Sequence, residues 1–206
     1  MNHIYNEQTG HKETYEMLLK QDPEHWSCSM ANELRRLVQG VGEQMKSGNN
    51  NIFYIKKNQI PKGCQITYCT IMCDYRPLKD DPYCVQLTVG GDRLTYDYDA
   101  GSPAASLTDA KILFNSIIST QNAKFMSADI KDYFLCSPMD RYEYAKIPFK
   151  IIPEEIRKQY NLYKLVEDDG YVYFEIRKGM YGLKQAARLA YNNLVKKLAP
   201  EGYYPL

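Results

Sequence analysis

Apolar residues recur three or four positions apart in several stretches of the chain, as on the buried face of an amphipathic helix. The longest stretch begins at Ser29, behind an Asp22-Pro23 pair that suits a helix cap followed by proline, and predicts a helix that ends at 47–49. The same spacing predicts a single helical turn at residues 15–19 and helices at 107–118, 154–160 and 185–198. Ser106 and Asp109 form a capping-box pattern at the start of the helix at 107–118.

Short apolar or alternating runs between turn residues predict strands. These runs cover residues 52–55, 66–73, 84–89, 125–130 and 171–176. Asp129 stands at the end of the fourth run, and the acidic segment that ends at Gly170 predicts a hairpin turn before the fifth. Helices and strands do not alternate strictly, as they do in a doubly wound parallel sheet, so the pattern predicts an α+β fold.

The composition is that of a folded protein with its own core: 206 residues, of which 44% are hydrophobic and 25% charged. Residues 1–25 are mostly polar and predict a lead-in to a domain at 26–206. The longest apolar run, near residues 110–114, is far too short to cross a bilayer, so we expect no membrane partner. The polar start has no secretory signal pattern, which favours a cytoplasmic or nuclear location.

Six cysteines in a chain without an export signal are expected to be reduced thiols. Four of them are close in the sequence: Cys64, Cys69, Cys73 and Cys84. Their spacing matches no zinc-binding pattern, so we interpret them as small apolar residues on neighbouring strands.

Charge is distributed unevenly, although the formal net charge is only +1. Residues 74–109 contain seven acids and three bases, whereas residues 177–197 contain six bases and no acid. The basic segment suits a polyanion such as a nucleic-acid backbone, and it equally suits a solvated helix face.

Asp129 is the first candidate for chemistry, because the pattern places its carboxylate at the end of an apolar strand and beside large side chains. One strand-end carboxylate can supply part of a site for Mg²⁺ and a phosphate-bearing substrate. A lone aspartate in such a position also commonly forms a turn or caps a helix.

Four segments together resemble the reverse transcriptase domain of copia-type retrotransposons. They are TVGGDRL at 88–94, NSIISTQNAKFMSADIKDYFL at 115–135, SPMDRYEYAKIP at 137–148 and IRKGMYGLKQAARLAYNNLVKKLAPEGYYP at 176–205. The last is the most specific, since GLKQA followed by a helix and then by glycine and an aromatic residue is hard to find by chance. The resemblance runs from about Trp26 to the end of the chain.

The resemblance implies a right-hand polymerase fold, here the fingers and the first part of the palm, with an antiparallel sheet and packed helices. It implies RNA-directed DNA synthesis with two Mg²⁺ ions, which activate the primer 3′ hydroxyl for attack on the incoming nucleotide. The implied partners are an RNA template, a primer or DNA duplex, deoxynucleoside triphosphates and the remainder of a polyprotein.

The first implied site segment is centred on Asp129, which matches the first palm aspartate and ligand of both metals. The backbone carbonyl of Ile130 is implied as a further ligand beside the nucleotide. Phe134 matches the bulky residue that stacks under the deoxyribose and excludes a ribose 2′ hydroxyl. From the residues alone, Phe134 is equally a core aromatic.

The second implied segment contacts the nucleotide and the template through Tyr181, Gly182 and Lys184, where glycine permits close backbone approach. Three bases around it are implied nucleic-acid contacts: Arg177, Lys178 and Arg188. For Arg177 and Lys178, a basic strand end is an equally good interpretation.

The chain departs from the family pattern in three places. The family has an Asp-Asp pair after the Gly-Leu-Lys motif, and the sequence reaches Leu206 before any such pair. Gln86 stands where the family usually has an arginine for the triphosphate, and Ala187 where it usually has proline. We therefore expect the isolated chain to be inactive. The alternatives are a non-catalytic nucleic-acid-binding remnant and a decayed reading frame without function.

Overall fold

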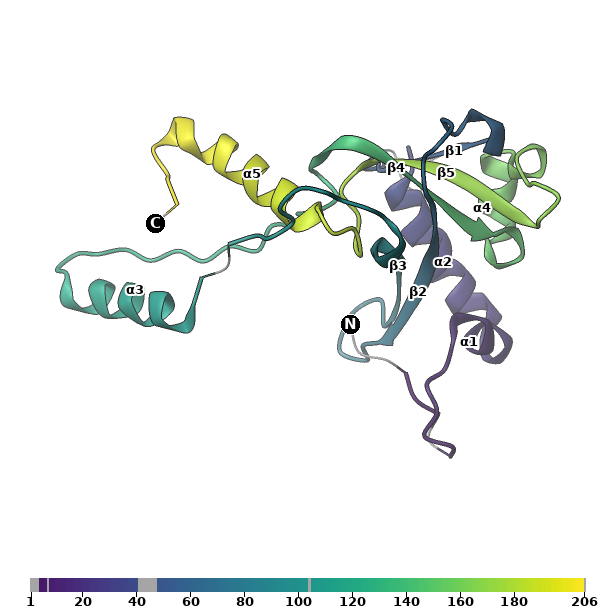
Figure 1. Ribbon diagram of the computed structural model, residues 1–206. Helices are drawn as coiled ribbons and strands as arrows, with labels where there is room; N and C mark the ends of the chain where they lie inside the picture. Colours follow the sequence, from purple (N-terminus) through teal and green to yellow (C-terminus); the bar gives the residue numbers. More distant parts are fainter. Residues whose placement is uncertain (1–3, 7, 41–47, 104, 206) are drawn as a thin grey trace.

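The computed structural model describes residues 4–6, 8–40, 48–103 and 105–205, and it has an α+β fold (Figure 1). Its helices are α1 (Tyr15–Gln21), α2 (Pro23–Leu37), α3 (Leu107–Ser119), α4 (Glu154–Gln159) and α5 (Ala186–Leu198). Its strands are β1 (Ile52–Ile55), β2 (Ile66–Tyr75), β3 (Tyr83–Val89), β4 (Pro138–Pro148) and β5 (Tyr171–Lys178).

The strands form one curled sheet in the order β1-β5-β4-β2-β3. Three of the four pairings are antiparallel, but β2 runs parallel to β4, with Ile66 opposite Tyr144. The prediction of an antiparallel sheet is therefore wrong for this pair. More than sixty residues separate the two strands, enough for the chain to return and enter β4 in the direction of β2.

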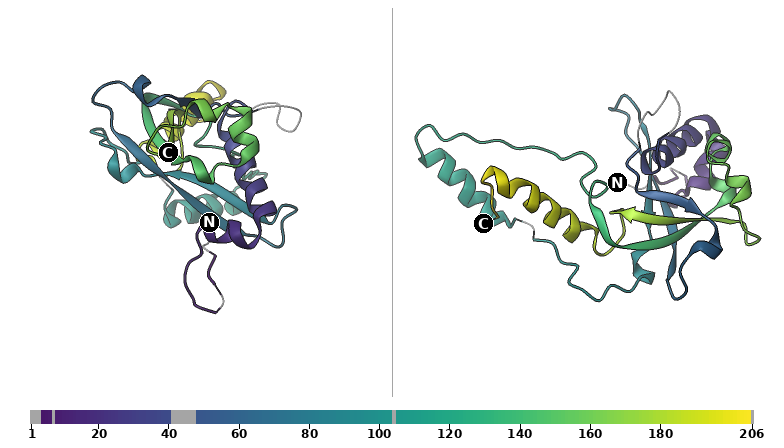
Figure 2. Two further views of the ribbon diagram at one scale, coloured as in Figure 1. Left: turned by 90° about the vertical axis from the view of Figure 1, so that its right-hand side faces the viewer. Right: turned by 90° about the horizontal axis from the view of Figure 1, so that it is seen from above.

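Helix α2 covers one face of the sheet, as Figures 1 and 2 show, and supplies much of the core. Its apolar face buries Met30, Leu34 and Leu37 completely, together with Leu87 of β3. Helix α1 packs against α2 and buries Tyr15 and Leu18. This part of the polar lead-in therefore belongs to the core.

The start of α2 is as predicted, but its end is not. Asp22 caps the helix by accepting a hydrogen bond from the His25 backbone N–H, and Pro23 occupies the first helical position. The helix ends at Leu37, about ten residues before the predicted end at 47–49. Val38 is extended and Gly40 has a positive φ of 71°, which breaks the helical path. The rest of the predicted helix, 41–47, lies outside the described residues.

Four predicted strands are confirmed as β1, β2, β3 and β5. The strand predicted at 125–130 is wrong, because the structure has no regular element there. Strand β4 was not predicted, since its sequence alternates poorly and begins and ends with proline. It forms because it pairs with both β2 and β5, which buries Tyr144, Ala145 and Ile147.

The turn predicted at 167–170 is present: Gly170 has a φ of 76° and donates its N–H to the Glu167 carbonyl. It is not the turn of a two-strand hairpin. Helix α4, itself predicted, lies between β4 and this turn in the chain.

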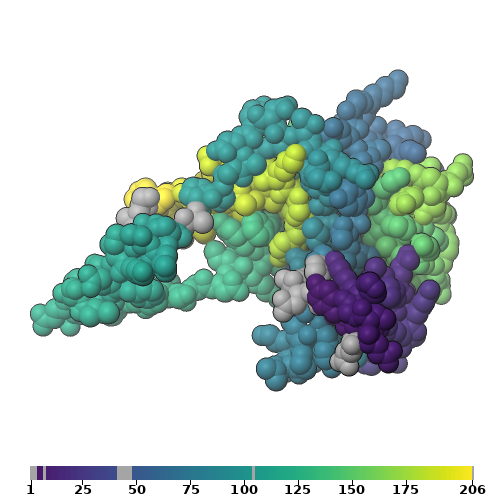
Figure 3. All heavy atoms as spheres, turned by 60° about the horizontal axis from the view of Figure 1, so that its bottom comes forward, coloured from purple at the N-terminus to yellow at the C-terminus, as the bar shows by residue number. Residues whose placement is uncertain are grey.

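Helices α3 and α5 extend from the same side of the sheet, and α3 is carried on two long extended segments (Figures 1 and 3). The capping box is confirmed, with Ser106 and Asp109 bonded reciprocally. No described residue of α3 is buried, and Ile118 is 85% exposed. None of the helices in the described part of the chain has the length and apolar character needed to span a bilayer.

All six cysteines are free thiols. Burial raises the pKa of Cys73 to about 12 and also raises that of Cys69. Both lie on β2, as expected for small apolar residues of a strand. Cys28, Cys64 and Cys136 are exposed, and Cys84 is partly buried.

Candidate functional site

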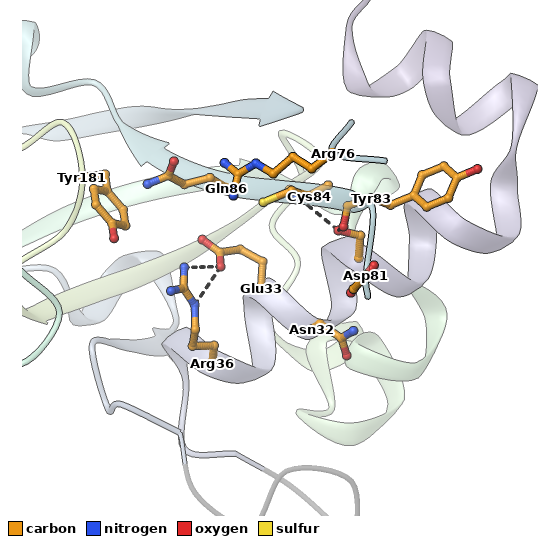
Figure 4. A pocket seen from close by; sticks show the side chains of 11 residues that line it. Asn32, Glu33, Arg36, Arg76, Asp81, Tyr83, Cys84, Gln86 and Tyr181 are labelled. Carbon is orange, nitrogen blue, oxygen red and sulfur yellow. Dashed lines mark hydrogen bonds and ion pairs between the residues drawn. The ribbon is translucent and has the colours of Figure 1, made fainter. Parts of the chain in front are cut away.

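A cavity of about 380 Å³ lies between α2 and β3 (Figure 4). Helix α2 contributes Glu33 and Arg36, and β3 contributes Cys84 and Gln86. The other lining residues are Ser29, Asn32, Arg76, Asp81, Tyr83, Val85 and Tyr181. We call this cavity the α2–β3 pocket. Cationic, carboxylate, amide and phenol groups line it together with apolar surface.

The loop at 179–185, between β5 and α5, carries Gly182, Leu183 and Lys184, and we call it the Gly-Leu-Lys loop. It closes one end of the pocket by direct backbone contact with the end of β3. The Val89 N–H donates to the Tyr181 carbonyl over 2.8 Å. Gly182 has a φ of 93°, and a Cβ there would lie 2.0 Å from the Val89 carbonyl oxygen. A Cβ on Gly91 would lie 2.1 Å from the Gly182 carbonyl oxygen. Only glycine permits this approach, which fixes Tyr181 at the pocket.

Phe134 packs against this loop. Its ring meets the edge of the Tyr181 ring at a centroid distance of 5.7 Å, and it also contacts Tyr133 at 5.5 Å. The side chain is partly buried against the core. The predicted nucleotide-binding residues Phe134, Tyr181 and Gly182 therefore lie together, and Phe134 also has the packing of a structural aromatic.

Glu33 is a buried carboxylate at the wall of the pocket, with only 3% of its side chain exposed. It accepts hydrogen bonds from the Leu87 backbone N–H at 3.0 Å and from the Arg36 Nε at 3.0 Å. Burial raises the pKa of Glu33, and the Arg36 guanidinium opposes that shift. Arg36 also donates to Asp132 over 2.7 Å. Figure 4 shows the guanidinium pointing at Glu33.

The β3 side of the pocket carries one cation and one neutral amide. Arg76 is paired with Asp74 at 2.8 Å, which raises the pKa of the guanidinium. Gln86 brings hydrogen-bonding capacity but no charge. Burial raises the pKa of the Cys84 thiol, and Arg76 opposes it. The acids beside both arginines reduce the positive potential available to an anionic ligand.

Asp129 does not line this pocket. It lies in the irregular segment where a strand was predicted, with an exposed side chain, and Ile130 beside it is also exposed. Within the described residues, no three His, Cys, Asp or Glu side chains come together as metal ligands. Mg²⁺ binding therefore stays a prediction.

The predicted basic contacts already have partners within the protein. Arg177 pairs with Glu175 at 2.6 Å and stacks on the Phe53 ring. Lys178 and Lys184 donate to backbone carbonyls, of Asn49 at 2.5 Å and of Leu94 at 2.9 Å. Arg188 donates to the Gly101 carbonyl and lies 3.6 Å from Asp99.

Sequence reasoning missed Glu33, Arg36 and Asp132. The sequence did contain a signal for Glu33, because this residue stands between Met30 and Leu34 on the apolar face of a predicted helix. An acid in that position indicates a buried, paired carboxylate. Asp132 carried no comparable signal, since its partner is almost a hundred residues away in the chain.

No significant match to this chain was found among protein-family models, curated proteins or solved structures.

Proposed function

We propose that this chain is the N-terminal portion of a copia-type reverse transcriptase and that its α2–β3 pocket binds a deoxynucleoside triphosphate. The observation that carries the proposal is the meeting of three resembling segments at one place. Segment 88–94 contributes Gly91, segment 115–135 contributes Phe134, and segment 176–205 contributes Tyr181 and Gly182. These segments are far apart in the sequence. Phe134, Tyr181 and Gly182 are residues to which the resemblance gives a role at the nucleotide, and Gly91 joins them through its contact with Gly182.

The pocket offers the groups such a ligand needs. Arg36 and Arg76 are cations for phosphate oxygens, and the amide of Gln86 can donate a hydrogen bond between them. Tyr181 provides an aromatic surface beside Phe134. Because both arginines are already paired with acids, we expect weak binding. We also expect binding without nucleotide incorporation, because the described residues assemble no set of carboxylates for two metals.

Cys84 provides a direct test, because its thiol lines the pocket. Thymidine triphosphate is expected to slow alkylation of Cys84 by iodoacetamide about fivefold when present at about four times its Kd, by simple mass action. Peptide mass spectrometry measures the rate. The exposed thiols Cys28 and Cys136 are internal controls. Equal slowing at all three thiols, or none at Cys84 up to millimolar nucleotide, contradicts the proposal.

Restoring a cation at position 86 should strengthen binding. We expect Gln86→Arg to lower the Kd for thymidine triphosphate about five- to tenfold, because a charge-assisted hydrogen bond to phosphate contributes about 1–1.5 kcal/mol. Protection of Cys84 measures the Kd. Gln8→Arg adds the same charge at an exposed site away from the pocket and should leave the Kd unchanged. An equal gain in both variants would show a nonspecific charge effect.

One observation favours a second function, nucleic-acid binding through α5. Lys196 and Lys197 are exposed on this projecting helix and have no acidic partner among the described residues (Figure 1). We expect the affinity for single-stranded RNA to fall with salt, and Lys196→Gln with Lys197→Gln to reduce the log–log slope by about 1.4. Fluorescence anisotropy measures the affinity, and Lys62→Gln is the control. An affinity independent of salt would contradict this function.

A further inference from the structure

The turn at 131–137 carries Phe134 and follows an irregular segment, so its position depends on bonds to the rest of the molecule. Inside the turn, the Cys136 N–H donates to the Asp132 carbonyl at 3.0 Å and the Ser137 N–H to the Phe134 carbonyl at 3.2 Å. Asp132 has a positive φ of 55°, which aspartate and asparagine tolerate better than most residues. The turn is a defined unit, and side chains from outside it hold it in place. Asn193 of α5 donates to the Ser137 hydroxyl over 3.4 Å, and three further side chains come from α2 and from the segment before β1.

Arg36 of α2 is the first of these side chains. Its Nη1 donates to Asp132 Oδ1 over 2.7 Å while its Nε donates to Glu33 Oε2 over 3.0 Å. The side chain of Asp132 is only 14% exposed, so the pair is poorly screened by water. A guanidinium can serve two carboxylates in this way, whereas the single ammonium of lysine cannot span both in the same geometry.

Asn49 and Asn51, directly before β1, supply two further side chains that hold the turn. Asn49 donates its Nδ2 to Asp132 Oδ2 over 3.1 Å, and its backbone N–H bonds to the Arg36 carbonyl at 2.8 Å. Asn51 is fully buried, and its Nδ2 donates to the Leu135 carbonyl at 3.0 Å and to the Gly179 carbonyl at 2.8 Å. One amide thus ties the turn to the start of the Gly-Leu-Lys loop.

We propose that Arg36, Asn49, Asn51 and Asp132 form a positioning clamp that holds the turn so that Phe134 stays against Tyr181. The inference rests on the proposed function, because the clamp would set the shape of the pocket wall that meets the nucleotide. Asn49, Asn51 and Asp132 do not line the pocket, so their effect on the ligand passes through Phe134 and Tyr181. Arg36 has two roles, because it also lines the pocket directly.

Asp132→Asn tests the clamp with little risk to the fold, since asparagine keeps the shape and tolerates the positive φ. We expect amide hydrogen exchange in the peptide covering 131–137 to become about tenfold faster, because a charge-assisted bond to a partly buried group is lost. We expect the thymidine triphosphate concentration that half-protects Cys84 to rise about fivefold, a smaller change because Asn51 still holds the turn. Arg36→Lys keeps the charge but not the bridge, and should speed exchange in 131–137 in the same way. Only its exchange is compared, because Arg36 also lines the pocket and its substitution would change nucleotide binding directly.

The control is Asp169→Asn, which removes a more exposed carboxylate that is bonded to Tyr173 at the opposite end of β5. It should change neither the exchange of 131–137 nor the protection of Cys84. Unchanged exchange in Asp132→Asn would overturn the clamp. Faster exchange with unchanged nucleotide protection would overturn its positioning role. If wild-type Cys84 is not protected at all, the proposed function and the positioning role both fail, and the exchange data alone still decide whether the clamp holds the turn.

Discussion

Replacing Gly182 with alanine is expected to lower the free energy of unfolding by about 3–5 kcal/mol, as the sum of backbone strain and a lost contact. A φ of 93° is unfavourable for any residue with a Cβ. The new Cβ would also lie 2.0 Å from the Val89 carbonyl oxygen. That oxygen belongs to the backbone at the contact between the loop and β3, so it cannot rotate away as a side-chain atom could. The loop must shift and break the 2.8 Å bond from the Val89 N–H to the Tyr181 carbonyl.

Gly63 provides a matched control for this prediction. Its φ of 87° is almost the same, but a Cβ there would meet nothing within 4 Å. Gly63→Ala therefore carries the backbone strain alone, about 1–2 kcal/mol. Urea unfolding followed by tryptophan fluorescence measures both variants. If the two variants lost equal free energy of unfolding, the close approach of the Gly-Leu-Lys loop to β3 would contribute nothing to stability. That result would contradict the contact at the pocket wall.

The helices were the part of the fold most accessible from sequence, because their signals are local. The Asp22-Pro23 start of α2 and the Ser106–Asp109 capping box of α3 are both present where predicted. The end of α2 was missed because apolar residues at helical spacing continue past Gly40, at Val41 and Met45, whereas the conformation of Gly40 ends the helical path. Amphipathic spacing indicates which face of a helix would be buried. It does not establish that the helix continues.

The strands show where local patterns fail. The apolar run at 125–130 has the composition of a strand, yet it finds no partner among the described strands. Strand β4 has a poor pattern, yet it is central because β2 and β5 flank it. Strand formation depends on neighbours that are distant in the sequence, so composition alone misjudged both segments.

The residues of the candidate site also differ in whether the local sequence reveals them. Phe134, Tyr181 and Gly182 were accessible because each belongs to a motif that can be read within a few residues. Asp132 was not, because it meets Arg36 only through the folded chain. Glu33 is one helical turn from Arg36 on α2, and its place on the apolar face was a readable signal that was missed. The prediction for Asp129 depended on a strand that is absent, and its role therefore remains a prediction.

Replacing Glu33 with alanine is the second large expected effect, a loss of about 3 kcal/mol in the free energy of unfolding. The side chain is buried and accepts from the Leu87 N–H and from Arg36, so its removal leaves a buried backbone donor and part of a guanidinium without partners. Urea unfolding at neutral pH measures the loss. Glu154→Ala is the control, since Glu154 is half exposed and its ion pairs with Arg157 and Lys158 are solvated. Its loss should be much smaller.

The pH dependence separates the charge of Glu33 from its hydrogen bonds. Burial raises the folded-state pKa of this carboxyl above its ordinary value of 4.5, so the folded protein holds the proton to a higher pH than the unfolded chain does. Its contribution to stability is therefore greatest below pH 4.5 and falls as pH rises through the folded-state pKa. Glu33→Gln cannot titrate, so the stability of wild type relative to this variant should fall between acidic and neutral pH. A difference that stays constant over that range would mean that Arg36 fully compensates the burial of the carboxylate. The α2–β3 pocket would then present a neutral pair rather than an energetically costly anion.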